Sequence, residues 1–333
     1  MMTLEDCRAF YAQEVRWVAN VSSQALIDAY GRVPREKYLG PPPWQIASAD
    51  MRALAFLGTG STAQRKAVEP RDAAKQGPAS TGRPVTAYRT TDDPRDLYHN
   101  VVVALDAARD LNNGQPSALA LWIEALELKP GDRVYHLGCG VGYYTAIMAE
   151  VVGPGGSVAG SEVHTELAAR AAANLSGYPN VTVHSGDGAE FDPGPCDAML
   201  INAGVTHPHP LWLERLREGG RLVLPITMAI PQAPSLGKGI MAKITCLGGA
   251  YAAEIVSPIA VYSCSSVRDP QLEPILMKAL GNGSLFKLKS VRTDPHEPAE
   301  TCILHRSEVC VSSGEPAAPP IPPERERESG HRR

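Results

Sequence analysis

Three closely spaced glycines in the middle of the chain could form a turn that approaches a nucleotide-like ligand. Gly138, Gly140 and Gly142 follow a strand-like run at 133–137 and precede a helical run. Glycine has no Cβ, so the backbone of such a turn can come close to a ligand, and the N–H groups at the start of the next helix can bind it. The same turn also occurs where a strand and a helix merely pack tightly, so the glycines alone leave a binding role open.

Polar residues after the next three predicted strands favour the binding role. Glu162 lies about twenty residues past the glycines, where an acidic residue typically holds a pair of ribose hydroxyls. Asp187 and Gly188 follow the third strand, where they could hydrogen-bond an adenine amino group, and Asn202 follows the fourth. A dinucleotide fingerprint would require Gly or Ala where this chain has Tyr143. The loops therefore indicate one crevice, but not an NAD-type site.

The elements around these residues alternate between strand and helix, as a parallel sheet with covered faces requires. The pattern predicts a Rossmann-like, doubly wound α/β fold with a mostly parallel seven-stranded sheet and an antiparallel edge strand. Two later runs, 239–245 and 253–260, complete the sheet as that edge. The other predicted strands are 133–137, 157–161, 181–184, 197–202 and 221–226, and the helices are 143–152, 164–175 and 210–217.

The rest of the chain divides by composition around a binding domain at 85–265. Apolar residues at helical spacing predict a helical N-terminal cap at 1–48. Large apolar side chains are scarce at 58–84, so we expect a disordered insertion there. Residues 266–313 form a C-terminal extension, and the Pro-, Glu- and Arg-rich stretch 314–333 is expected to be a disordered tail.

Composition excludes several classes of partner. The formal net charge of the 333 residues is -4, so no basic field is present to hold a nucleic acid. No apolar run approaches the length of a membrane span, and no signal-peptide core is apparent near Met1. The 7 cysteines are irregularly spaced, which favours reduced thiols. We therefore expect a cytoplasmic protein that binds neither nucleic acid nor membrane.

With these residues in hand, the region from about 98 to 260 resembles the protein-L-isoaspartate O-methyltransferase family of class I S-adenosylmethionine-dependent methyltransferases. The likeness rests on four stretches of this region in chain order: Pro130-Gly131-Asp132-Arg133-Val134, the run from Gly138 to Tyr143, Asn202-Ala203-Gly204, and Gly219-Gly220-Arg221-Leu222-Val223-Leu224-Pro225. Outside it, Val33-Pro34-Arg35-Glu36 also resembles the family's N-terminal Val-Pro-Arg element.

The resemblance implies S-adenosyl-L-methionine as cofactor and a peptide or protein carboxylate, typically that of an isoaspartyl residue, as substrate and partner. It also implies a role in protein modification or repair. A carboxylate is ionised at neutral pH, so the protein needs mainly to position it. The expected cofactor contacts are His136, Gly138, Cys139, Gly140, Gly142, Tyr143, Glu162, Val163, Asp187, Gly188 and Asn202.

Two residues depart from the family pattern. Family members usually carry Ser-x-Pro-His before the helix that precedes the cofactor strand, but this chain has Gly114 at the serine position. His136 stands where the family usually has an acidic residue. We expect substrate contacts from Asn113, Gln115 and Ser117 instead, although this stretch is also typical of a plain turn. Methylation of a small molecule or a biosynthetic peptide, and a non-catalytic adaptor that binds S-adenosylmethionine, therefore remain alternatives.

Four residues near the C-terminus are types that ligate metals: His296, Cys302, His305 and Cys310. Their spacing fits no common zinc pattern. The alternation of Cys302, Leu304 and Cys310 instead favours a terminal hairpin with one apolar face. The sequence therefore predicts no metal site.

Overall fold

Five parallel strands form one half of the main sheet in this computed structural model, which describes residues 2–48, 88–109, 111–231, 233–264 and 266–316. The order across the sheet is β7-β6-β5-β8-β9, and every neighbouring pair among these five is parallel. The strands are β5 (Arg133–Leu137), β6 (Ser157–Glu162), β7 (Val181–Ser185), β8 (Cys196–Ile201) and β9 (Leu216–Ile230). The predicted α/β fold is confirmed, and its five parallel strands lie where the sequence pattern placed them.

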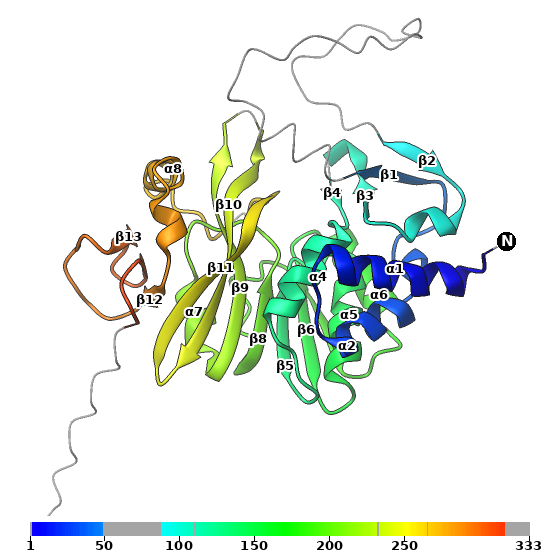
Figure 1. Ribbon diagram of the computed structural model, residues 1–333, viewed down its shortest axis with the longest axis horizontal. Coiled ribbons are helices and arrows are strands. Elements are labelled where there is room, and N and C mark those ends of the chain that lie inside the picture. Colours follow the sequence, from blue (N-terminus) through cyan, green and yellow to red (C-terminus); the bar gives the residue numbers. More distant parts are fainter. Residues whose placement is uncertain (1, 49–87, 110, 232, 265, 317–333) are drawn as a thin grey trace, which may run out of the picture.

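The antiparallel side of the sheet is larger than predicted. After β9 come β10 (Ala233–Leu247) and β11 (Ala250–Tyr262), which complete the seven predicted strands. The extension then adds β12 (Ser290–Arg292), β14 (Cys310–Ser312) and β13 (Cys302–His305), so the sheet has ten strands. Antiparallel strands can be joined by short turns, whereas parallel ones need a crossover. Figure 1 shows β10 and β11 beside β9. The antiparallel part of the sheet thus has five strands and not only the two predicted runs.

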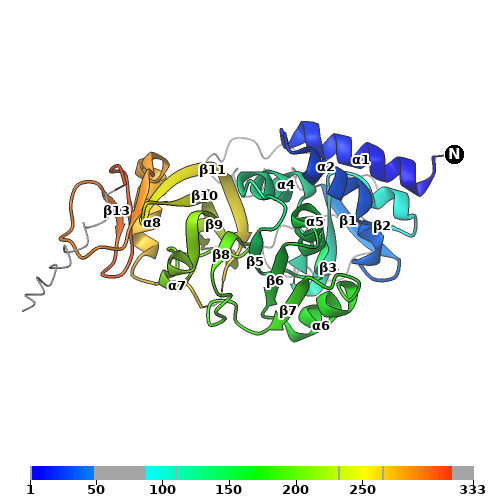
Figure 2. The same cartoon turned by 90° about the horizontal axis from the view of Figure 1, so that it is seen from below.

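Helices cover both faces of the sheet and enclose two apolar cores (Figure 2). One core is formed with α1 (Leu4–Val18), α2 (Gln24–Arg32), α4 (Pro116–Ala125), α5 (Tyr143–Val152) and α6 (Thr165–Asn174). The other is formed with α7 (Pro210–Glu214) and α8 (Glu273–Gly281). Short 3-10 helices occur at Arg35–Lys37, Pro94–Leu97, Ala107–Arg109 and Ser284–Lys287. Among the described helices, none is both long and apolar enough to cross a membrane.

A second, smaller sheet lies beside the N-terminal helices, in the order β2-β1-β3-β4. Its strands are β1 (Trp44–Ser48), β2 (Arg89–Thr91), β3 (Val101–Asp106) and β4 (Leu111–Asn112). The region 1–48, predicted as a helical cap, contains α1 and α2 but also β1, which pairs with β2 and β3 across the expected domain boundary. The predicted insertion at 58–84 and most of the predicted tail lie outside the described residues.

Candidate functional site

A cavity of about 660 Å³ opens at the carboxyl ends of the parallel strands. This is the size and position at which open α/β sheets bind small ligands. One end is formed by loops that follow β5, β6, β7 and β8, and the opposite wall by the last residues of β11. Of the predicted cofactor contacts, those that line the cavity are Gly138, Gly140, Glu162, Val163, Asp187, Gly188 and Asn202.

The glycine turn after β5 is fixed by hydrogen bonds to the neighbouring strand. The backbone N–H groups of Gly138 and Cys139 donate to the Ser161 carbonyl at 2.9 and 3.0 Å. Gly142 has φ +89° and precedes α5, and a Cβ there would lie 2.7 Å from Leu175 Cδ1. The turn therefore depends on glycine both for its conformation and for its packing against α6.

Glu162 is the acidic group at this end of the cavity, and it is only 6% exposed. Its Oε2 accepts a hydrogen bond from the Gly140 N–H at 2.8 Å, and its Oε1 accepts one from the His164 N–H at 3.0 Å. Each carboxylate oxygen can still accept a further hydrogen bond. Glu162 is thus held in place by the glycine turn while keeping the capacity to bind two vicinal hydroxyls.

The loops after β7 and β8 complete the same end of the cavity. Asp187 Oδ1 accepts hydrogen bonds from the Ala189 N–H and the Ser266 hydroxyl, both at 2.9 Å. A Cβ on Gly188 would lie 2.6 Å from the Tyr135 hydroxyl, so no larger residue fits there. The Asn202 N–H donates to the Leu137 carbonyl at 2.9 Å, which places Asn202 beside the glycine turn.

The other four predicted cofactor contacts do not line the cavity. Successive side chains of a strand point to opposite faces, so Leu137 lies at the cavity while His136 faces α5 and pairs with Thr145. Cys139 and Tyr143 are buried in the first core, and Gly142 packs against Leu175. These four residues therefore support the glycine turn without lining the cavity.

Burial shifts the pKa values of three of these residues, with that of the Tyr143 hydroxyl raised well above its usual range. It lowers the pKa of His136 to about 3, so the imidazole is neutral at physiological pH. It raises the pKa of the Cys139 thiol to about 12, and the charge of Glu162 adds to this shift. A thiol with so high a pKa is a poor nucleophile, so the buried Cys139 serves to fill space in the first core.

Only one of the three predicted substrate contacts lies at the cavity. Gln115 lines it, and its side chain makes no capping hydrogen bond although it is the N-cap residue of α4. The helix begins at Pro116, so Ser117 lies inside its first turn and does not line the cavity. Ser117 is buried within the helix, and Asn113 is turned inward, where its Oδ1 accepts from the Val103 N–H at 2.9 Å.

Gly114, at the position of the family's serine, also lines the cavity. Its φ is +77°, and an added Cβ would lie 2.7 Å from Leu119 Cδ2. The Tyr144 hydroxyl donates to the Gly114 carbonyl at 3.3 Å and fixes this part of the loop. The backbone here has therefore adapted to glycine, and a serine could not be restored without strain.

A buried arginine that sequence reasoning assigned no role supports the substrate loop. Arg35 is 0% exposed, and its guanidinium donates to the Leu97 and Val101 carbonyls at 2.6 and 2.7 Å. It also donates to Asn113 Oδ1 at 3.3 Å. The signal in the sequence that could have indicated this role is the place of Arg35 in the Val-Pro-Arg motif. A motif residue far from the glycine turn in sequence is expected to contact another part of the fold.

The segment after β11 contacts the loops that follow β7 and β8, and sequence reasoning missed it. Arg268 donates to the Gly204 and Thr227 carbonyls, both at 3.1 Å, and forms an ion pair with Glu273. Ser266 binds Asp187, as described above. Except for the pair with Glu273, these contacts join residues about 40 to 80 positions apart, so no local pattern could have indicated them.

The two histidines in the loop after β8 do not line the cavity. His207 Nδ1 is 2.9 Å from Thr206 Oγ1, and both residues are buried. His209 caps α7 by accepting from the Leu211 N–H. Burial lowers the pKa of His207 to about 4.

Comparison with known proteins identifies the family of this chain. The family model for protein-L-isoaspartate(D-aspartate) O-methyltransferase matches residues 86–238. A curated protein-L-isoaspartate O-methyltransferase of Archaeoglobus fulgidus is 38% identical over 146 residues, which are 40% of this chain and 67% of that protein. The chain belongs to this family. A family member from Ignicoccus hospitalis is likewise 38% identical, over 40% of this chain and 66% of the relative.

Solved structures agree on the fold. One protein-L-isoaspartate O-methyltransferase superposes with a TM-score of 0.53 at 19% identity, over 85% of this chain and 72% of the other. A Plasmodium falciparum structure described as a complex of such an enzyme with S-adenosyl-L-homocysteine has a TM-score of 0.51 at 15% identity, over 78% and 98%. In the curated relatives cited, the match spans about two thirds of the relative's length, and in others of the family about half.

Proposed function

We propose that this chain transfers a methyl group from S-adenosyl-L-methionine to a carboxylate of a peptide or protein, of the L-isoaspartyl type. The observation that carries the proposal is the buried Glu162 carboxylate, held against the glycine turn at one end of a cavity of about 660 Å³. Family membership supports the same reaction.

The residues at the cavity divide into two ends with separate roles. At the first end, Glu162 would bind the ribose hydroxyls, the loop at Asp187 and Gly188 would bind the adenine, and the turn at Gly138 would lie against the amino-acid part of the cofactor. The cofactor supplies an electrophilic methyl group on a sulfonium. At the second end, Gln115 reaches into the cavity beside the apolar wall of β11, where the acceptor would lie.

Positioning accounts for the chemistry that this site must perform. An acceptor carboxylate is already ionised, so one of its oxygens can attack the methyl carbon in line as the carbon–sulfur bond breaks. The products are a methyl ester and S-adenosylhomocysteine, and no proton has to be removed. Apolar residues of the cavity, which include Leu111, Trp122, Ile259 and Val261, would displace water from the carboxylate and so favour the attack.

A labelled-methyl assay tests the proposal directly. An isoaspartyl peptide and its aspartyl twin are incubated with the purified chain and cofactor, and base-labile methyl ester is counted. We expect label on the isoaspartyl peptide only, and none with Glu162→Ala. Transfer of label to both peptides, or to neither, would contradict the isoaspartyl assignment.

One observation favours a second acceptor class. Gly114 presents no side chain where the family's serine would stand, and its left-handed backbone disfavours one. A biosynthetic peptide or a small molecule with a carboxylate could therefore replace the isoaspartyl substrate. Label on members of a peptide and metabolite panel, with none on the isoaspartyl peptide, would support this alternative. Cofactor binding with no transfer to any acceptor would instead support a binding adaptor.

A further inference from the structure

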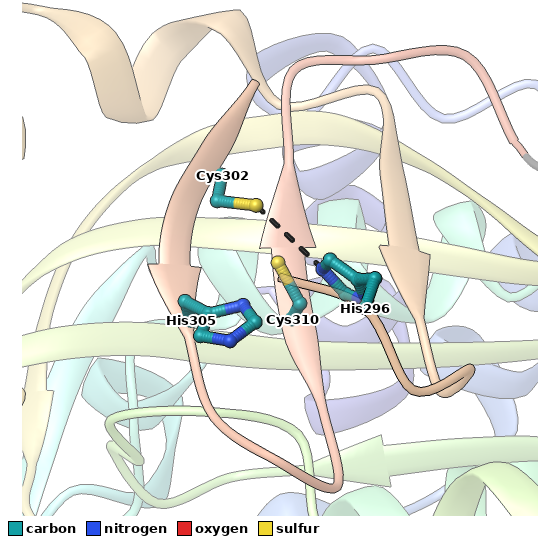
Figure 3. Close-up of side chains that lie close together, drawn as sticks. All are labelled: His296, Cys302, His305 and Cys310. Atoms are coloured by element: carbon teal, nitrogen blue, oxygen red, sulfur yellow. Dashed lines mark hydrogen bonds between the residues drawn. The ribbon is translucent and has the colours of Figure 1, made fainter. Parts of the chain in front are cut away.

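Four potential metal ligands converge in the C-terminal extension, far from the cavity in sequence. His296 comes from the loop after β12, Cys302 and His305 from β13, and Cys310 from β14 (Figure 3). Their ligand atoms all lie within 4.8 Å of one another. We propose that these four residues bind one zinc ion as a closed structural site.

The distances approach those of a tetrahedral centre. Zn–S bonds of about 2.3 Å and Zn–N bonds of about 2.1 Å in a tetrahedron separate the ligand atoms by about 3.4–3.8 Å. Cys302 Sγ and His296 Nε2 are 3.6 Å apart, the pair joined by the dashed line in Figure 3. A contraction of about 1 Å in the widest separation would bring the whole set into this range.

The surrounding hydrogen bonds suit ligands of a metal. His296 Nδ1 is 2.8 Å from the Asp294 carbonyl, so an N–H there would leave Nε2 free to ligate. The Ala299 N–H donates to Cys302 Sγ at 3.3 Å, which stabilises a thiolate. Nδ1 of His305 is buried and has no hydrogen-bond partner among the described residues.

The donor set decides the ion and its role. Two thiolates and two imidazoles in tetrahedral arrangement favour zinc over magnesium or calcium, which prefer oxygen. Four protein ligands leave no position for water or substrate, so the site is structural. It would join three strands of only 3 or 4 residues each, which have little core of their own.

The spacing explains why the sequence argued against this site. The order is His-x5-Cys-x2-His-x4-Cys, which is no common zinc motif. The predicted hairpin does form, but its turn and the loop from β12 bring the two histidines and two cysteines to one point. The zinc site thus uses the predicted hairpin as its frame.

Metal content of the full chain, purified without a polyhistidine tag, is the first measurement. Mass spectrometry of the metals should find about one zinc per chain. Cys302→Ser and His305→Ala should lose it, while Cys7→Ser, which removes a thiol from α1, should keep it. A wild-type protein without zinc, or variants that retain zinc at the level of Cys7→Ser, would overturn the proposal.

Cobalt binding to the wild-type protein can be measured even if some variants do not fold. Wild-type apo-protein titrated with Co²⁺ alone should develop the visible bands of a tetrahedral S₂N₂ site, saturating at about one ion per chain. His305→Cys should keep the metal and gain thiolate-to-cobalt charge transfer. Absence of these bands, or an intact mass lower by two hydrogens that reports a Cys302–Cys310 disulfide, would refute a zinc site.

Discussion

The Glu162 carboxylate is the residue on which the proposed cofactor site depends most. It is nearly buried, charged, and held by two backbone N–H groups beside the cavity. Glu162→Gln should weaken binding of S-adenosylhomocysteine about tenfold or more, because a hydrogen bond to a charged group contributes about 1.5–3 kcal/mol. Calorimetric titration measures this. Glu166→Gln, on the exposed start of α6, is the control and should bind like wild type.

Gln115 should affect turnover and leave cofactor binding unchanged. Its side chain lines the acceptor end of the cavity and makes no capping bond, so Gln115→Ala removes a polar contact without unfolding α4. We expect kcat/KM to fall about tenfold, the equivalent of one neutral hydrogen bond. The dissociation constant of the cofactor should stay the same. Equal kcat/KM in variant and wild type would exclude Gln115 from the site.

The neutral His136 makes stability depend on pH. Its pKa is about 3 in the fold and near 6.5 when unfolded, so the unfolded chain binds an extra proton between these values. Stability is therefore complete above pH 6.5 and decreases as pH falls, by about 2 kcal/mol from pH 7 to pH 5. Urea unfolding of wild type and His136→Gln at both pH values tests this. Between pH 7 and pH 5, the decrease in unfolding free energy should be about 2 kcal/mol smaller for the variant than for wild type. Equal decreases would contradict the burial of a neutral imidazole.

Among the elements, the loop from β4 to α4 shows how backbone conformation constrains chemistry. Gly114→Ser would restore the family's serine, but it meets a φ of +77° and a contact with Leu119. Left-handed backbone costs an L-residue about 1–2 kcal/mol, so stability should fall by at least that much, with no gain in turnover. Gly131→Ala is the matched control, because its φ is +92° with no atom within 4 Å of an added Cβ. A fully stable and faster Gly114→Ser enzyme would refute this interpretation.

The sequence predicted those elements whose signals are local. Buried parallel strands and the glycine turn have recognisable patterns, so β5 and α5 begin and end where they were expected. The cavity residues Glu162 and Asp187 were found because strand ends converge at one edge. The direction in which individual side chains point was harder to predict. Asn113 turns toward Arg35 rather than the crevice because of a contact across 78 positions.

At the scale of the whole molecule, long-range contacts are what the sequence could not reveal. The four proposed zinc ligands lie close to one another only because β14 pairs with both β12 and β13. The segment after β11 contacts the loops that follow β7 and β8 through Ser266 and Arg268. Both features belong to the antiparallel half of the sheet, which proved larger than the sequence pattern indicated.

One ion pair joins two parts of the C-terminal extension, β13 and the segment that follows β11. Arg306, at the end of β13, pairs with Asp269, whose N–H donates to Thr206 Oγ1 at 2.9 Å. Asp269 lies three residues after Ser266, which holds Asp187 at the proposed adenine end. The end of β13 therefore supports residues 266–269, and we expect loss of this ion pair to weaken the proposed cofactor site through Ser266 and Asp187.

Arg306→Gln tests this connection. Amide exchange at 266–269 should accelerate by no more than about fivefold, because a partly exposed ion pair contributes at most about 1 kcal/mol. Cofactor affinity should weaken by a similar factor, while zinc content and exchange in α5 stay at wild-type values. Arg217→Gln, which breaks an ion pair with Asp197 at the opposite ends of the strands, should change neither. Equal effects of the two variants would mean that the extension folds onto the sheet without bracing the cavity.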